Sequence, residues 1–129
     1  MYDFVFNAHS GLRYLILLVG LLTALLALVG MTQKQPATSA GLTLLRVFVV
    51  LLDIQLLLGV LTLITGTFYM QLIGHLVMMT AAVAVAHLAS SRLRKAPPEA
   101  SGSGQLLVGA LIPLALIVAG ILAIQRPIF

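Results

Sequence analysis

The chain has 129 residues, of which 61% are hydrophobic and only 8% are charged. Charged residues make up about a quarter of an ordinary soluble domain, so this composition excludes that class and indicates a membrane protein. The net charge of +4 comes from few residues. It argues against nucleic-acid binding and indicates topology signals and contacts with lipid headgroups. Because the sequence contains no cysteine, disulfides, thiolate metal sites, iron–sulfur clusters and covalently attached haem are excluded.

Four apolar stretches are long enough to cross a bilayer, whose hydrocarbon core of about 30 Å needs roughly 20 residues of helix. None shows the alternation that is typical of a membrane β-strand, so helices are expected. The predicted spans cover about residues 10–31, 42–66, 70–90 and 105–124. Together they predict one all-α domain, residues 1–129, folded as a four-helix transmembrane bundle.

The connections between the predicted spans are polar or contain residues that break helices. Pro36 ends the polar stretch that follows the first span. Gly66 lies in a tight turn between the second and third spans, and residues 96–104 predict a flexible linker before the fourth.

Lysine and arginine predict the orientation, because they accumulate in cytoplasmic loops. Lys34 lies between the first two spans, with Arg46 just inside the second. The connection between the third and fourth spans carries Arg92, Arg94 and Lys95, whereas the connection between the second and third carries no charge. Both termini are therefore expected on the outer side (N-out, C-out) of a bacterial inner membrane.

Ionisable side chains in or beside the apolar stretches are costly and are often functional. His9 and His75 are expected near the same outer side, at depths from which they could reach one another or one ligand. Arg13 follows His9 by one helical turn and lies on the same face. The sequence thus predicts an outer polar cluster of His9, Arg13 and His75.

A second group of polar residues is expected deeper in the membrane. His87 follows His75 by twelve residues, which is about 18 Å along a helix and about 120° around it, so the two cannot share a ligand. Arg46 and Asp53 share a face of the second span, two turns apart. We expect a polar intramembrane cluster of Arg46, Asp53 and His87, with Gln55 pointing away from Asp53 and able to bond to another helix.

The outer cluster has a functional and a purely structural interpretation. Haem b needs two axial imidazoles on different helices, which His9 and His75 could supply, while Arg13 could face the propionates. Gly11 and Gly74, next to the histidines, could let the ring approach the backbone. Alternatively, both histidines are boundary residues bonded to backbone, water or headgroups. Three histidines allow at most one such haem, and no other metal site is expected.

The inner cluster has the same two kinds of interpretation. A carboxylate and an imidazole at membrane depth could relay protons or accept a proton from a quinol. Alternatively, Asp53 pairs with Arg46, His87 or a partner chain only to offset the cost of its burial.

Small residues indicate close helix packing. The pairs Gly20 and Ala24, and Ala82 and Ala86, have the spacing that permits close approach between helices. A four-helix chain with short connections and no soluble domain has little surface for chemistry of its own. This favours a role as a subunit of a larger assembly.

A resemblance to known proteins begins with the run Asn7-Ala8-His9-Ser10-Gly11-Leu12-Arg13-Tyr14. It extends to Asp53-Ile54-Gln55-Leu56-Leu57-Leu58-Gly59 and to Gly74-His75-Leu76-Val77-Met78-Met79, and so covers three of the four spans. These runs resemble small four-helix bacterial membrane proteins labelled cytochrome b-like. The resemblance implies His9, Gln55 and His75 as the polar positions of the family. Size and topology would also suit an accessory subunit of a quinol-oxidising complex such as alternative complex III.

Two expectations about function follow. The first is a non-catalytic accessory subunit of a bacterial quinol-oxidising electron-transfer complex, without a cofactor of its own, that contacts larger membrane subunits, lipids and a quinone. The alternative is a b-type cytochrome that binds one haem through His9 and His75. A third class, a small transporter or proton channel using Asp53 and His87, lacks the broken helices or repeats that are typical of transporters.

Overall fold

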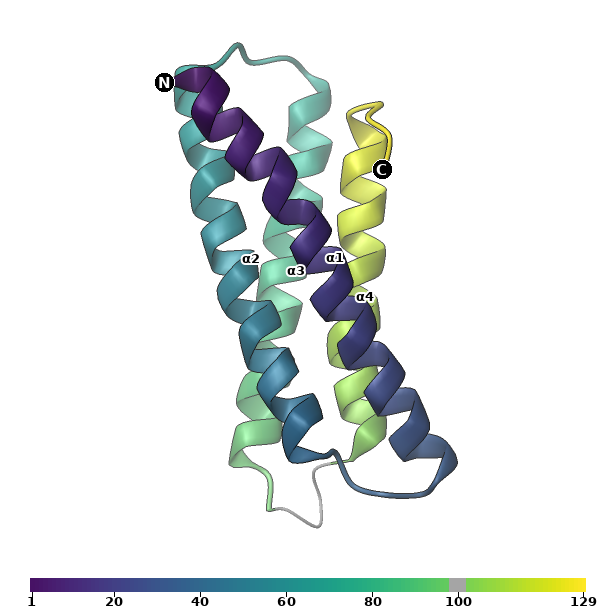
Figure 1. Cartoon of the computed structure of the whole chain (residues 1–129). Coiled ribbons are helices and arrows are strands. Elements are labelled where there is room, and N and C mark those ends of the chain that lie inside the picture. The colour runs from purple at the N-terminus through teal and green to yellow at the C-terminus, as the bar shows by residue number, and fades with distance from the viewer. Residues whose placement is uncertain (98–101) are drawn as a thin grey trace.

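The computed structural model describes residues 1–97 and 102–129, and within them the chain forms four antiparallel helices (Figure 1). They are α1 (Tyr2–Thr32), α2 (Ser39–Thr65), α3 (Gln71–Lys95) and α4 (Ser103–Ala123). Each is long and apolar enough to cross a membrane. The predicted all-helical architecture is confirmed for the described residues. Of the linker predicted at 96–104, residues 98–101 lie outside the described part.

The helices extend beyond the predicted spans, most clearly at the start of the chain. α1 begins at Tyr2 instead of about Ser10, so His9 lies inside the helix. Residues 2–9 contain neither proline nor glycine, so nothing in them breaks a helix even though several are polar. At the other end of the bundle, α3 continues to Lys95 through a basic last turn, which the helix dipole stabilises.

The four helices form a ring in which each packs against the next along the chain and α4 returns to α1. α1 packs most closely on α2 and α3 most closely on α4, whereas the seam between α2 and α3 is the loosest around the ring. Both chain termini lie at one end of the bundle, here called the terminal end (Figure 1). The opposite end, here called the basic end, contains Lys34 and the last turn of α3. Which end faces outward stays a prediction.

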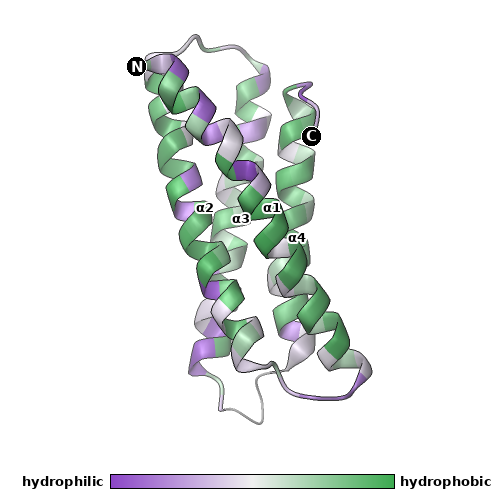
Figure 2. Ribbon diagram, viewed as in Figure 1, coloured by the Kyte–Doolittle hydropathy of each residue, from purple (hydrophilic) through white to green (hydrophobic). Residues whose placement is uncertain are grey.

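Apolar residues make up most of the length of the four helices (Figure 2), and many of their large side chains are exposed on the outside of the bundle. Large side chains in the middle of the spans, such as Leu57 and Val77, are 60% and 59% exposed. Such a surface is costly in water but suits contact with lipid tails, while the backbone polar groups are satisfied inside each helix.

The tightly packed core occupies the middle of the bundle and its basic half. Phe48 and Ile16 are the largest fully buried side chains. α2 has no buried residue after Gln55, and α3 has none before Ala82. The terminal half of the α2–α3 seam is therefore not closed by core packing.

Small residues bring the helices close together, as their spacing predicted. A Cβ atom at Gly20 would lie 2.7 Å from Leu114 Cδ2 on α4 and 2.9 Å from Phe48 Cε2 on α2. Ala82 and Ala86 on α3 have no exposed surface. Helix α1 thus contacts both of its neighbours through a position where only a glycine fits without a shift.

The first turn of α2 is capped by a side chain. Thr38 Oγ1 accepts a hydrogen bond of 3.1 Å from the backbone N–H of Gly41. We expect Thr38→Ala to lower the free energy of unfolding by about 1 kcal/mol, because one N–H at the helix start loses its partner. Unfolding followed by circular dichroism in detergent measures this. Thr38→Ser keeps the acceptor, so an equal loss in that variant would contradict the assignment.

Candidate functional site

A cavity of about 380 Å³ lies in the terminal half of the bundle, and all four helices contribute to its walls. Its size is within the range of small-molecule and cofactor sites, and its walls are mostly apolar, as in such sites. It extends from Tyr2 and Gly66 near the terminal end to Val83, where the packed core begins. The region that the core leaves open is thus the region that could hold a ligand.

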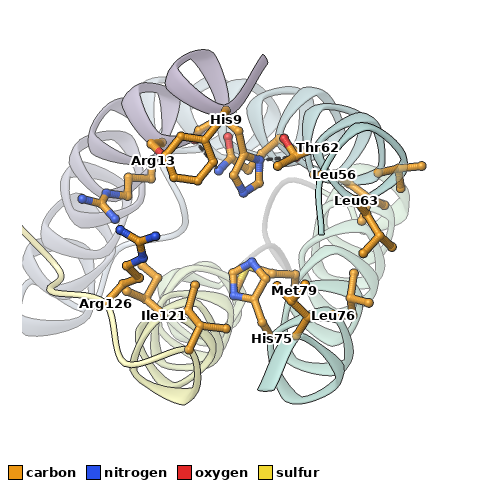
Figure 3. Close-up of a pocket in the computed structure, with 18 of the residues that line it drawn as sticks. His9, Arg13, Leu56, Thr62, Leu63, His75, Leu76, Met79, Ile121 and Arg126 are labelled. Carbon is orange, nitrogen blue, oxygen red and sulfur yellow. Dashed lines mark hydrogen bonds between the residues drawn. The ribbon is translucent and has the colours of Figure 1, made fainter. Parts of the chain in front are cut away.

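His9 on α1 and His75 on α3 point toward one another across this cavity (Figure 3). Their ring centres are 6.3 Å apart and the ring planes are inclined by 76°. The structure therefore brings together the two histidines whose depths in the sequence placed them near one another.

A backbone carbonyl on a neighbouring helix orients each of these histidines. His9 Nδ1 lies 3.2 Å from the carbonyl oxygen of Gln55, and His75 Nδ1 lies 2.9 Å from that of Gly120. Because a carbonyl oxygen only accepts, Nδ1 carries the proton and donates it. The Nε2 atom of a neutral ring then keeps its lone pair for a ligand. Histidines that bind metals are commonly oriented in this way.

Gln55 fixes His9 from a second direction. Its Nε2 atom donates a hydrogen bond of 2.9 Å to the backbone oxygen of His9, so α1 and α2 are bonded both ways at this point. Gln55 is 9% exposed, and its Oε1 atom is buried without a partner among the described residues. The sequence predicted that Gln55 points away from Asp53 and can bond to another helix, and Gln55 indeed bonds to α1 and lines the cavity.

Two glycines to which the sequence assigned no role lie against the side chains of the cavity. A Cβ atom at Gly59 would lie 3.1 Å from His9 Cε1, so this glycine makes room for the histidine. A Cβ atom at Gly120 would lie 2.5 Å from Met79 Cε and 3.1 Å from Met78 Cβ, so this glycine makes room for the two methionines of α3, while His75 Nδ1 would be at an ordinary 3.5 Å. Gly59 follows Gln55 by one helical turn and so lies on the same face of α2. The sequence could therefore have indicated Gly59 as a residue of the cavity wall by its spacing from Gln55. It gave no comparable indication for Gly120, which is one of several small residues in α4.

The glycines near the histidines in sequence, Gly11 and Gly74, do not line the cavity. A Cβ atom at Gly11 would have nothing within 4 Å, and one at Gly74 would meet only Ala123 Cβ, at an ordinary 3.6 Å. Their expected role, to let a haem approach the backbone, stays a prediction.

Arg13 and Arg126 face one another at one side of the cavity, between α1 and the end of the chain (Figure 3). Arg13 Nη2 donates to the Tyr14 hydroxyl at 2.8 Å, and Arg126 Cζ lies 5.7 Å from the centre of the Phe6 ring. Arg13 Nε is buried without a partner among the described residues. None of the described residues that line the cavity is acidic. This side of the cavity therefore presents positive charge that suits an anionic group.

Asp53 and His87 form a separate pair on the outside of the α2–α3 seam. His87 Nε2 lies 2.8 Å from Asp53 Oδ1, and the two side chains are 52% and 47% exposed respectively. Arg46, two turns away on α2, makes no ion pair among the described residues. The structure thus brings together Asp53 and His87, two of the three residues of the expected inner cluster, and leaves Arg46 apart. Both the proton relay and the structural ion pair predict this contact, so the two interpretations stay open.

Within residues 1–97 and 102–129, no group of three or more histidine, aspartate or glutamate side chains is placed to hold a metal ion. Comparison of the chain with protein-family models, with curated proteins and with solved structures gives no match. The resemblance to cytochrome b-like proteins therefore stays a prediction, and the function has to be argued from the geometry of the cavity.

Proposed function

We propose that this chain is a membrane-bound b-type haem protein that transfers electrons, with His9 and His75 as the axial ligands of one haem. The observation that carries the proposal is the separation of the two rings. A bond from a metal to an imidazole nitrogen is about 2 Å long, and the ring centre lies roughly 1 Å further on, so two histidines on opposite sides of one iron have ring centres about 6 Å apart. The distance between the rings of His9 and His75 is 6.3 Å.

The hydrogen bonds of the two rings support the same proposal. Both Nδ1 atoms are engaged by carbonyl oxygens, which leaves both Nε2 atoms as the donors to a metal. Such a carbonyl partner fixes the tautomer and the ring orientation of a ligand histidine and raises its basicity. The structural alternative, in which both histidines bond to the backbone, accounts for these two hydrogen bonds as well. The separation of the two rings is the observation that favours a haem.

The rest of the cavity suits the other parts of a haem. Its walls are mostly apolar, as the macrocycle requires, and Arg13 and Arg126 present two guanidinium groups at one side (Figure 3). Guanidinium groups pair well with carboxylates, so this side suits the two propionates. The buried and unpartnered Arg13 Nε would then gain an acceptor.

Two protein ligands on the iron leave no open position for oxygen or for a substrate. Electron transfer is the chemistry that remains for such a site. The accessory role in a quinol-oxidising complex stays a prediction, and an electron-transfer subunit of a larger assembly would be compatible with it.

The experiment that tests the proposal is spectroscopy of the purified protein. The protein, expressed with an adequate supply of haem and purified in mild detergent, is expected to show a Soret band and a reduced-minus-oxidised spectrum of the b type. Acid acetone should extract the haem, because the chain has no cysteine for covalent attachment, in a ratio of about one per chain. Folded helical protein without Soret absorbance and without extractable haem would overturn the proposal.

Removing the positive charge beside the cavity is expected to change the redox potential. The double variant Arg13→Gln, Arg126→Gln lacks two positive charges beside the cavity. Their loss stabilises the oxidised iron relative to the reduced iron, because the oxidised iron carries one more positive charge. The midpoint potential should therefore fall by roughly 20–60 mV, or about 0.5–1.4 kcal/mol for one electron. A spectroelectrochemical titration measures it. Lys34→Gln at the basic end serves as the control, and an equal fall in that variant would contradict a local effect.

A further inference from the structure

A second cavity, of about 370 Å³, lies at the basic end between the first turns of α2 and the last turns of α3. It shares no lining residue with the histidine cavity. Its walls also include Pro36 and Ala37 from the connection that precedes α2. This cavity therefore has no part in the proposed haem site and needs an explanation of its own.

Two helices each contribute a positively charged side chain to this cavity. Arg46 on α2 and Arg94 on α3 both line it, and no acidic side chain is among its described lining residues. The carboxylate of Asp53, on the same helix as Arg46, is already engaged by His87. The hydroxyl groups of Ser39 and Ser90 add hydrogen-bond donors to the walls. An anion with several acceptor oxygens matches this set of groups.

The remaining walls of the cavity are apolar. Leu45 and Leu93, which are 1% and 3% exposed, form its buried side, and the half-buried Leu42 also lines it. A ligand that fits has an anionic group and an apolar part in contact with each other. A free inorganic anion uses only half of this surface.

We propose that this cavity binds the headgroup of an anionic phospholipid, with its phosphate between Arg46 and Arg94 and the start of an acyl chain on Leu42. Arginine suits phosphate because its planar group donates two parallel hydrogen bonds. The basic end is the end predicted to face the cytoplasmic leaflet, where anionic lipids attract basic residues near the membrane surface. The site is independent of haem.

Thermal unfolding in the presence of defined lipids tests this proposal. The wild-type protein, delipidated in a neutral detergent, is titrated with phosphatidylglycerol, with phosphatidylcholine of the same acyl chains, and with inorganic phosphate. Phosphatidylglycerol is expected to raise the melting temperature in a saturable way, because a ligand that binds the folded state stabilises it. Phosphatidylcholine or inorganic phosphate that raised it equally would overturn the proposal.

Two matched double variants locate the site. Arg46→Gln, Arg94→Gln is expected to weaken the apparent affinity for phosphatidylglycerol roughly tenfold or more, because both phosphate partners are lost. Arg92→Gln, Lys95→Gln removes the same charge from the last turn of α3 but from positions that do not line the cavity, and it should retain the wild-type affinity. Equal weakening in the two variants would show a diffuse charge effect and would overturn the proposed site.

Discussion

Replacement of His75 by alanine is expected to abolish haem binding, so that the purified variant loses its Soret absorbance. The alanine variant lacks one of two axial ligands, and the carbonyl oxygen of Gly120, which the His75 ring now contacts at 2.9 Å, cannot replace an imidazole nitrogen. His9→Ala should have the same effect, because the two rings lie on opposite sides of the proposed iron position.

His87→Ala is the matched control for these variants. His87 lies on the same helix as His75, but it is half exposed, bonds to Asp53 and does not line the cavity. Haem content should therefore stay near one per chain. A second measurement distinguishes loss of a ligand from misfolding. If only the ligand is missing, His75→Gly supplemented with free imidazole should regain the spectrum of a haem with two imidazole ligands. Loss of haem from His87→Ala to the same extent, or full haem content in His75→Ala, would contradict the ligand assignment.

Gly20→Leu is expected to lower the stability of the bundle. Even a Cβ atom at this position would lie within 3 Å of both Leu114 and Phe48, and Phe48 is completely buried. The larger side chain would force α1 away from α2 and α4, since close-packed interiors do not yield easily. Overpacking of this kind costs about 1–3 kcal/mol. The free energy of unfolding in detergent, followed by loss of helical signal, measures the effect.

Gly11→Leu provides the control for this prediction. It is the same substitution on the same helix, but a Cβ atom at Gly11 has nothing within 4 Å. A leucine also favours helix more than glycine does, by about 0.8–1 kcal/mol. Stability should therefore stay equal or rise in Gly11→Leu, and a fall that matched that of Gly20→Leu would show that the close contact is not the cause.

The fold was predictable from the sequence because one physical effect dominates it. A backbone in lipid must satisfy its own hydrogen bonds, so long apolar runs form helices whatever their detailed packing. The start of α1 was misplaced because hydropathy does not detect a polar helical turn such as the one before His9. The similar depths of His9 and His75 were predictable, since the rise per residue in a helix is fixed, and they allowed the two histidines to meet.

The finer parts of the site were not predictable, because they depend on how each helix is rotated about its axis. Rotation is set by side-chain packing, which one sequence does not reveal. It selects the backbone of His9 as the partner of Gln55, where the sequence predicted only a bond to another helix. Arg126 lies in the segment after α4, which carries no periodic pattern. The composition of that segment therefore did not predict that the Arg126 side chain lines the cavity.

Each histidine is fixed within its own helical hairpin. His9 on α1 is held by Gln55 of α2, whereas His75 on α3 is held by Gly120 of α4. A hairpin of two helices is a natural unit of insertion into a bilayer, so each ligand can adopt its orientation before the other half of the chain arrives. In the proposed haem protein, the iron would then join α1 of one hairpin to α3 of the other across the inside of the bundle. Cofactor capture would be the last step of biogenesis, and a bundle that failed to acquire haem would stay weakly closed along α2 and α3.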